Sequence, residues 1–203
     1  MSTLLVLGAG GHGRVVADAA LRQGGWHEVS ATDRDGACCS GELLPGVRLG
    51  VLEVMLPQAS AVHIAIGNAQ SRETEARAIG MERLAAVVHP DATLSPHAQL
   101  GAGCFLAARA VVAPRANLGA CVIVNHGAVV DHDVQVGDFC HIAPNAALGG
   151  DVRLGKRVLV GSGASVLPGV SICDDAVIGA GSVVLADIAE PGAYAGSPAR
   201  RIR

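Results

Sequence analysis

The stretch that decides the fold runs from residue 118 to residue 136 and reads LGACVIVNHGAVVDHDVQV. Its aliphatic residues recur at every sixth position, at Leu118, Val124, Val130 and Val136. A period of six fits neither a helix, which repeats near 3.6 residues, nor a simple strand, which alternates with a period of two. It fits a short strand followed by a tight turn, in which one aliphatic side chain of each repeat points inward.

The repeat continues far beyond that stretch on both sides. Stepping by six meets seventeen aliphatic residues without a gap: Val88, Leu94, Leu100, Leu106, Val112, Leu118, Val124, Val130, Val136, Ile142, Leu148, Leu154, Val160, Val166, Ile172, Ile178 and Val184. The fourth residue after each is small or β-branched. Three such faces close a triangle, so each coil takes 18 residues and the prism has between five and six coils. We therefore predict that residues 86–203 form a parallel β-helix domain with a C-terminal tail. The ladder should end at Glu190-Pro191-Gly192, where proline cannot continue it.

Composition agrees with a thinly layered core. Hydrophobic residues make up 50% of the chain, but aromatic residues only 2%, and the 27 glycines indicate frequent tight bends. The net charge is −3 and no basic stripe is present, which argues against nucleic acid as a partner. No apolar run approaches the ~20 residues that span a bilayer. The first residues also lack the basic start of a signal peptide, so we expect a cytoplasmic protein with no membrane span.

Residues 1–85 predict a separate α/β domain. A buried strand at Leu4–Leu7 leads into the loop Gly8–Gly13, which reads GAGGHG, and then into an amphipathic helix. This arrangement matches G-x-G-x-x-G, the phosphate-binding turn of dinucleotide-binding folds. A third strand over residues 61–66 is followed by a helix near residues 72–79. The domain has room for one half of a Rossmann fold, so the fold class is mixed: a small Rossmann-like half-domain, then the β-helix.

Such a half-domain offers one phosphate-binding helix N-terminus and one carboxylate at a strand end. It suits a mononucleotide or a nucleotide-sugar better than a nicotinamide cofactor, although that cofactor and a purely structural turn are the alternatives. In the loop, the His12 side chain either donates to a phosphate or caps the helix. The candidate substrate-binding residues are Gly10, Gly11, His12, Gly13, Asp33, Gly67 and Asn68.

Histidines are the candidate bases on the repeat: His89, His97, His126, His132 and His141. A zinc site is the competing interpretation, because the γ-class carbonic anhydrases place three histidine ligands on a similar β-helix. Two ligands of that family lie five residues apart, and no two of these histidines do. The six cysteines contain no Cys-x-x-Cys pair either. We therefore expect no metal. For His97 and His126, we favour solvated surface histidines.

Several motifs, in order along nearly the whole chain, resemble one family. They are Gly8–Gly13 with its histidine, Ile64–Asn68, Asn125–Asp133, Phe139–His141 and Gly196–Arg200. The chain resembles the bacterial sugar acetyltransferases that modify nucleotide-linked 4-amino sugars in the bacillosamine and perosamine pathways, with the sialic acid O-acetyltransferases as relatives. The resemblance implies a left-handed β-helix of hexapeptide repeats, a homotrimer, and acetyl-CoA as co-substrate.

The resemblance also implies roles for the residues of the repeat. His132 is the general base, Asp133 orients its ring, His141 bonds the acetyl group or the amine, and Asn125 supports the site. The chemistry agrees, because imidazole titrates near working pH and a thioester is already activated for direct attack. Where family members often carry an acidic pair after the second strand, this chain has Asp33 alone.

For acetyl-CoA, the resemblance implies contacts from His141 and from the backbone at Gly150, Ser162 and Ala180. The last two are 18 residues apart and therefore stack on one side of the prism, as an extended pantetheine arm requires. Three arginines at the C-terminus either contact the CoA phosphates or only keep the tail soluble: Arg200, Arg201 and Arg203.

The spacing of His132 and His141 has a consequence for assembly. Nine residues are half a coil, so the two side chains lie on opposite sides of one prism and can meet only across a subunit interface. We expect an acetyl-CoA-dependent acetyltransferase acting on the amine of a nucleotide-linked 4-amino-4,6-dideoxy sugar in surface glycan biosynthesis. The alternatives are O-acetylation of a sugar hydroxyl and a non-catalytic nucleotide-sugar-binding protein.

Overall fold

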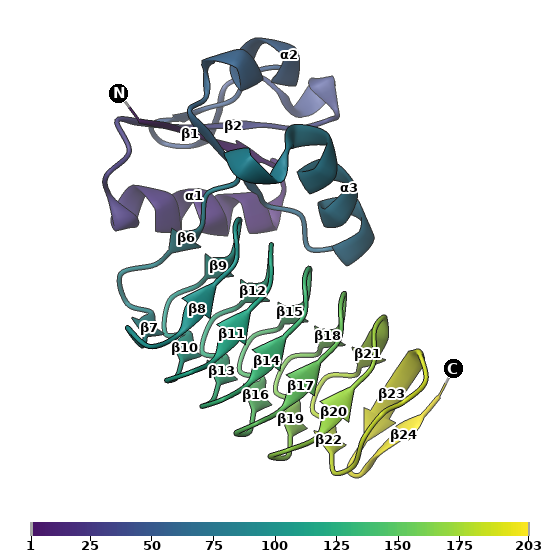
Figure 1. The fold of residues 1–203 in the computed structure, drawn as a ribbon. Helices are drawn as coiled ribbons and strands as arrows, with labels where there is room; N and C mark the ends of the chain where they lie inside the picture. The colour runs from purple at the N-terminus through teal and green to yellow at the C-terminus, as the bar shows by residue number, and fades with distance from the viewer. Residues whose placement is uncertain (1, 203) are drawn as a thin grey trace.

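A computed structural model describes residues 2–202, so Arg203 lies outside it. The chain folds into a small α/β part followed by a long triangular prism of stacked strands, as Figure 1 shows. This is the predicted fold class, a Rossmann-like half-domain in front of a parallel β-helix. Among the described residues, no helix has the length and apolar character needed to cross a membrane.

The α/β part is built on a parallel sheet in the order β2-β1-β5. Its strands are β1 (Thr3–Leu7), β2 (Glu28–Thr32) and β5 (Ala61–Ile64). The helices are α1 (Gly11–Gln23), α2 (Leu52–Met55) and α3 (Ala69–Ile79). Short elements connect them: η1 (Gly36–Cys38), β3 (Glu42–Leu44), β4 (Val47–Arg48), η2 (Leu56–Gln58) and η3 (Met81–Arg83).

Strand β1 is apolar from Leu4 to Leu7 because both faces of the sheet are covered there. Leu4 and Val6 pack in one cluster with α1, whereas Leu5 and Leu7 pack in another with α2 and α3. The central strand thus separates two small cores. The loop after β1 and the loop after β5 emerge at the same edge of the sheet, since parallel strands end together.

In the β-helix, each strand pairs in parallel with the strand three places further along the chain, so that residues 18 apart are neighbours, as Ile123 and His141 are. The three faces have distinct outer surfaces, and we name them by their strands. The junction face consists of β6 (Val87–Val88), β9 (Phe105–Leu106), β12 (Ile123–Val124), β15 (His141–Ile142), β18 (Leu159–Val160) and β21 (Ala176–Ile178). The valine face consists of β7 (Thr93–Leu94), β10 (Val111–Val112), β13 (Val129–Val130), β16 (Ala147–Leu148), β19 (Ser165–Val166) and β22 (Val183–Val184). The polar face consists of β8 (Gln99–Leu100), β11 (Asn117–Leu118), β14 (Gln135–Val136), β17 (Arg153–Leu154) and β20 (Ser171–Ile172).

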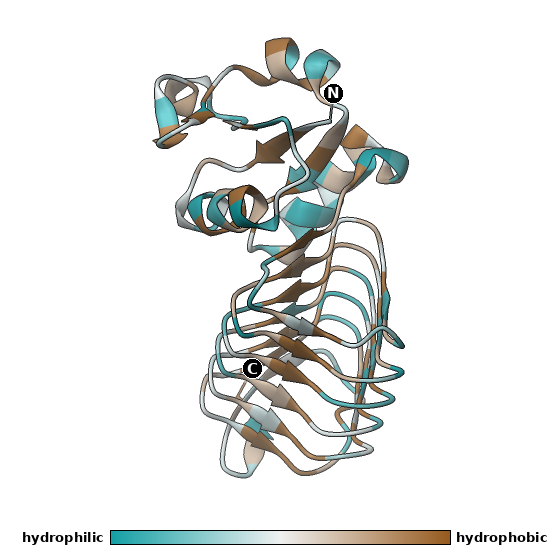
Figure 2. Ribbon diagram, turned by 90° about the vertical axis from the view of Figure 1, so that its left-hand side faces the viewer, coloured by the Kyte–Doolittle hydropathy of each residue, from teal (hydrophilic) through white to brown (hydrophobic). Residues whose placement is uncertain are grey.

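The interior of the prism confirms the six-residue pattern. Val124 and Val130 of the aliphatic series are fully buried, and so are Ala128 and Val134 of the small series. They belong to one continuous core that runs along the prism. In Figure 2 the hydrophobic strands stack in columns along its length.

The glycines of the β-helix occupy two kinds of position. The glycine that often follows the aliphatic residue allows coils to stack closely: a Cβ on Gly101 would lie 2.5 Å from the carbonyl carbon of Gly119. The sharp bends occur two positions later, where φ is near +60°. Glycines such as Gly127 and Gly163 stand at some of these bends, as predicted, and residues such as Arg115, Asp133 and Arg157 stand at others. Non-glycine residues bear this left-handed conformation at a cost, which the stacked ladder on either side sustains.

The prediction that the ladder ends at Pro191 is wrong for one face. Strand β23 (Gly192–Gly196) pairs in parallel with β21, and β24 (Ala199–Arg201) returns antiparallel to it. Pro191 lies just before β23, where its missing N–H costs no ladder bond. The hairpin extends the junction face at the C-terminal end of the prism.

Candidate active site

The α/β part docks on the outer surface of the junction face. Along one outward row of that face, Val87, Phe105 and Ile123 are completely covered by α1 and β1. The row continues on the next strands with His141, then Leu159 and Val177. His141 therefore stands where the cover ends, at the edge of the α/β part.

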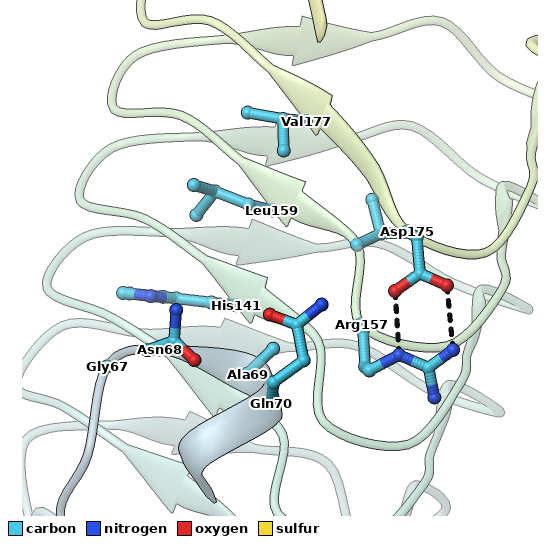
Figure 3. A pocket seen from close by; sticks show the side chains of 10 residues that line it. Gly67, Asn68, Ala69, Gln70, His141, Arg157, Leu159, Asp175 and Val177 are labelled. Atoms are coloured by element: carbon cyan, nitrogen blue, oxygen red, sulfur yellow. Dashed lines mark hydrogen bonds and ion pairs between the residues drawn. The ribbon is translucent and has the colours of Figure 1, made fainter. Parts of the chain in front are cut away.

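A cavity of about 180 Å³ opens at that edge. One wall is the start of α3 with its preceding loop, Gly67–Gln70, and the other is the junction face. Figure 3 shows His141, Leu159 and Val177 on successive strands of that wall. On the far side, Arg157 donates two hydrogen bonds of 2.7 Å to the carboxylate of Asp175. The cavity thus combines an apolar floor with charged and polar groups at its rim.

His141 is neutral at physiological pH. Burial lowers the pKa of His141 to about 4, and the nearby positive charge of Arg72 contributes in the same direction. Its Nε2 lies 3.2 Å from the side-chain nitrogen of Asn125, whose oxygen already accepts from the backbone N–H of His126. Asn125 is therefore the donor, His141 Nε2 accepts, and the proton of the ring is on Nδ1.

The glycine loop meets the β-helix at His12. The His12 ring centroid lies 6.4 Å from that of His141 and 5.4 Å from that of Phe105. Burial, and then the neighbouring His63, lower the pKa of His12 to about 3. Within the described residues its Nε2 is buried without a hydrogen-bond partner. A buried polar atom of this kind is a candidate contact for a ligand.

The other candidate residues of the α/β part lie where its strands β1, β2 and β5 end. Some of them also fix the conformation of the neighbouring loops. Gly10 and Gly11 are exposed at the start of α1, where no side chain caps the helix. Gly13 packs against the loop, since a Cβ there would lie 1.9 Å from the oxygen of Gly8.

Asp33 and Asn68 are both engaged by backbone N–H groups. The two carboxylate oxygens of Asp33 accept from Ala9 at 2.7 Å and from Asp35 at 3.1 Å. Asn68 accepts from Ser71 at 2.9 Å and so caps α3. Asp33 fixes the glycine loop, and Asn68 keeps its amide nitrogen available toward the cavity.

His132 lies at the corner between the valine face and the polar face. Its Nδ1 is 3.0 Å from one oxygen of Asp133, and the other oxygen of Asp133 accepts from Arg115 Nε at 2.5 Å. The bond to Asp133, and then the charge of Asp131, raise the pKa of His132. His132 and Arg115 in turn lower the pKa of Asp133. Since Nδ1 donates to the carboxylate, Nε2 carries the lone pair of the neutral ring.

Gly150, one coil further on, lies directly under this imidazole. A Cβ at that position would lie 2.5 Å from Cε1 and 2.6 Å from Nε2 of His132. The absence of a side chain there leaves room for the ring. The His132 side chain is otherwise open, with 62% of its surface exposed.

The structure therefore separates the candidate residues into two groups. His12, Gly67, Asn68, Asn125 and His141 gather where the α/β part meets the junction face. His132, Asp133 and Gly150 lie at a different corner of the prism and do not line the cavity. The half-coil offset between His132 and His141 is thus a real separation within one chain.

The remaining candidates lie along the prism and its tail. Ser162 and Ala180 are exposed at one corner on consecutive coils, where the Ser162 carbonyl accepts from the N–H of Gly181 at 2.8 Å. Arg200 is exposed on β24. The described residues include no group of three or more His, Cys, Asp or Glu side chains placed to hold a metal ion.

Some residues of the site went unpredicted. Arg157 with Asp175, and Arg115 with Asp133, are pairs 18 residues apart, so a search for opposite charges one coil apart finds both. Arg72 carries no such signal, because it sits in a polar helix segment between Ser71 and Glu73. Its position became clear only from the docking of α3 on the prism.

Comparison with known families matches both parts of the chain. A family model described as the PglD N-terminal domain matches residues 3–79, and one described as bacterial transferase hexapeptide (six repeats) matches residues 151–186. A search of curated protein sequences gave no significant match.

Solved structures match over the full length. The acetyltransferase domain of PglB from Neisseria gonorrhoeae is 35% identical, with 100% of both chains covered and a TM-score of 0.91. Its complex with acetyl coenzyme A is similar at 35% identity, with 98% of both chains covered and a TM-score of 0.90. PerB from Caulobacter crescentus, solved with CoA and GDP-perosamine, is 33% identical, with 99% of this chain and 97% of PerB covered and a TM-score of 0.90.

Hexapeptide coils, together with full-length similarity to acetyltransferases solved with CoA, define the class: the protein is an acetyltransferase of the hexapeptide-repeat type. More narrowly, the chain belongs to the bacterial nucleotide-sugar N-acetyltransferases, the family of the PglB acetyltransferase domain and PerB.

Proposed function

We propose that the protein transfers the acetyl group of acetyl-CoA to the amine of a nucleotide-linked 4-amino-4,6-dideoxy sugar. The observation that carries this proposal is the meeting of His12 and His141. The glycine loop Gly8–Gly13 of the α/β part, which resembles a phosphate-binding loop, thus lies beside His141 of the β-helix. An acceptor held by the first part therefore reaches the second. The relatives support the choice of substrate, since PerB was solved with CoA and GDP-perosamine.

Residues 1–85 form the acceptor domain in this proposal. The free N–H groups at the start of α1, at Gly10, Gly11 and His12, suit a diphosphate, because a helix N-terminus carries a partial positive charge. His12 Nε2, which has no partner among the described residues, is placed for a polar group of the acceptor. Gly67 and Asn68 cover the sugar end at the cavity.

Residues 86–203 hold the donor. The acetyl-CoA arm runs along the prism past Ser162 and Ala180, and Arg200 meets its phosphates. Gly150 lies at the His132 corner and contacts the arm from the neighbouring copy. Ser162 and Ala180 stack on one corner of the prism, as an extended pantetheine arm requires. No metal takes part, because a thioester is activated enough for direct attack by an amine.

The reaction is a single acyl transfer assisted by His132. The amine nitrogen attacks the thioester carbonyl as its proton moves to His132 Nε2, the nitrogen left free by the bond to Asp133. The C–S bond then breaks, and the thiolate of CoA takes the proton from the imidazolium. Asp133 stabilises that imidazolium, while His141 and Asn125 hold the acetyl group or the amine.

One chain alone does not bring His132 to His141, so the site is completed by a neighbouring copy. We propose a homotrimer with an active site at each subunit interface. The valine face supports this arrangement, because its outward Val111, Val129 and Val183 remain partly exposed and border the His132 corner. Small apolar side chains on a flat sheet suit close packing against a second prism.

The direct test combines purified protein, acetyl-CoA and a panel of nucleotide-linked amino and hydroxy sugars, with acetylated product followed by mass spectrometry. We expect acetylation of 4-amino sugars. Acetylation of hydroxy sugars alone would instead show O-acetyl transfer. Binding without any acetylation would show a sugar-binding protein.

The His132→Ala variant tests the base. It should lose at least about 100-fold in kcat, in line with the usual contribution of a general base. Its affinity for acetyl-CoA, measured by calorimetry, should stay within about twofold, since the base acts on the acceptor amine. Unchanged turnover would contradict the assignment. His27→Ala, a change of an exposed histidine just before β2 and away from the site, is the matched control.

A further inference from the structure

Arg72 is a buried cation at the centre of the molecule. It lies in the first turn of α3, and only 1% of it is exposed. Its guanidinium group donates five hydrogen bonds of 2.5–3.3 Å, and every acceptor is a backbone carbonyl. The acceptors are the carbonyl oxygens of Ile66, Gly67, Cys121, Phe139 and Cys140.

These carbonyls come from both sides of the cavity. Ile66 and Gly67 belong to the loop between β5 and α3, on the acceptor side. Cys121 and Phe139 lie in turns of the β-helix, and Cys140 immediately precedes His141. One planar group therefore connects the loop that lines the cavity with the strand that carries His141.

A charged group is a costly way to join two surfaces. Among the described residues no carboxylate pairs with Arg72, and burial lowers the pKa of Arg72 to about 10. Apolar packing already joins the two parts nearby, through Phe105 and Ile123. What a guanidinium adds to such packing is direction, because five donors in a rigid plane fix the positions of their acceptors.

We infer that Arg72 is a positioning residue of the transfer site, which holds the Gly67–Asn68 loop at a fixed place opposite His141. The inference rests on the proposed function, since it concerns the acceptor cavity. Arg72 touches no reacting atom and acts through the loop and the strand. Without the Arg72 guanidinium, the Gly67–Asn68 loop that lines the acceptor cavity can shift. The surface of the prism proposed to bind acetyl-CoA is unchanged.

Arg72→Lys is the decisive variant, because lysine keeps the charge and three donors but lacks the planar arrangement of five donors in a guanidinium. We expect the KM for the amino-sugar acceptor to rise at least tenfold while the KM for acetyl-CoA stays within twofold. Arg72→Met, which keeps volume but no donor, should show a larger rise in the acceptor KM. A purely structural role would lower the melting temperature and the active fraction but leave both KM values unchanged.

Arg83→Lys is the matched control. Arg83 also donates to two backbone carbonyls, those of Leu56 and Ala59, but both lie inside the α/β part, away from the cavity. Its replacement should leave both KM values within twofold. Equal effects of the two lysine variants on the acceptor KM would overturn the inference, and so would an Arg72→Lys protein that does not fold.

A second readout does not depend on turnover. The charged and titratable groups that face His141 are His12 from α1, Arg72 from α3, and the Arg157–Asp175 pair across the cavity. Arg72→Lys should let the Gly67–Asn68 loop move away and expose His141 to water. In ¹⁵N NMR of histidine-labelled protein, His141 should then titrate at higher pH than in the wild type. Arg83→Lys should not. If the wild type acetylated no amino sugar, the proposed function would fail, while this titration would still decide the role of Arg72.

Discussion

At the scale of single residues, His132 has the environment of a base. The Asp133 carboxylate holds its Nδ1 proton, and Arg115 holds the carboxylate from the other side. All three side chains are substantially exposed, so each bond on its own is weak in free energy. Their importance lies in orientation, since the chain of bonds points Nε2 away from the prism.

The pH dependence of the reaction should follow from this environment. Asp133 raises the pKa of His132 above the ordinary 6.5, and in the proposed mechanism the neutral ring is the active form. The rate kcat/KM should therefore rise with pH and level off above an inflection that lies higher than 6.5. Asp133→Asn should move the inflection to lower pH and reduce the plateau by about tenfold or more, because the imidazolium loses its partner.

Asp131→Asn provides the comparison. The charge of Asp131 raises the pKa of His132 less than the hydrogen bond to Asp133 does. Asp131→Asn should therefore move the inflection of the pH–rate profile less than Asp133→Asn does. A pH–rate profile of the three proteins at one ionic strength gives the answer. An inflection that is unmoved in Asp133→Asn would mean that His132 is not the group that titrates.

Gly150→Ala should disable His132 without unfolding the protein. The added methyl group would lie 2.5–2.6 Å from two ring atoms of His132, and the open ring can swing away at little cost. We expect a change in stability below about 1 kcal/mol and a fall in kcat of about tenfold or more. Steady-state kinetics and thermal melting check both. A change confined to the KM for acetyl-CoA would instead show that the methyl group blocks the donor.

Gly36→Ala is its control, because nothing lies within 4 Å of the Cβ position there. It should change neither kcat nor either KM. A fall in kcat equal to that of Gly150→Ala would rule out the explanation by contact with the His132 ring.

At the scale of elements, the sequence predicts those features that depend on the six-residue repeat. The inward series predicted the strands from β6 to β22, because the aliphatic side chain at each sixth residue must point into the prism. It did not predict β23 and β24, which lie beyond the repeat. The outward row of the junction face obeys no period. Phe105 and Ile123 are covered and Val177 is open, and the choice depends on where the α/β part docks. For the same reason Arg72 and the cavity were not predictable from local pattern.

The outward row makes a prediction about stability. Phe105 is fully buried against the α/β part, whereas Val177 on the same row is 40% exposed. Phe105→Ala should destabilise the protein by about 3–5 kcal/mol through lost burial and a cavity. Val177→Ala, the control, should cost less than about 1 kcal/mol. Urea denaturation followed by circular dichroism compares them, and equal midpoints would contradict the docking.

At the scale of the whole molecule, the candidate site residues form two separate groups. The loops of the α/β part and His141 form one, at the junction face. His132, Asp133 and Gly150 form the other, at the corner between the valine and polar faces. A rigid prism cannot bend to join them, since each coil is held by its neighbours on both sides. In the proposed mechanism, only a second copy placed against the first completes the site.

Mixing two inactive variants should therefore restore activity. In a trimer assembled at random from equal amounts of His132→Ala and His141→Ala chains, about one quarter of the interfaces would pair an intact His132 with an intact His141. Co-refolded protein should regain close to that share of wild-type turnover, while each variant alone stays low. Mixing His132→Ala with Asp133→Asn is the control, because both groups belong to the same corner of one chain and no interface can combine them. No restoration in the first mixture would show that the site lies within a single chain. Equal restoration in the control would show that the regained activity does not report the pairing of His132 with His141 across an interface.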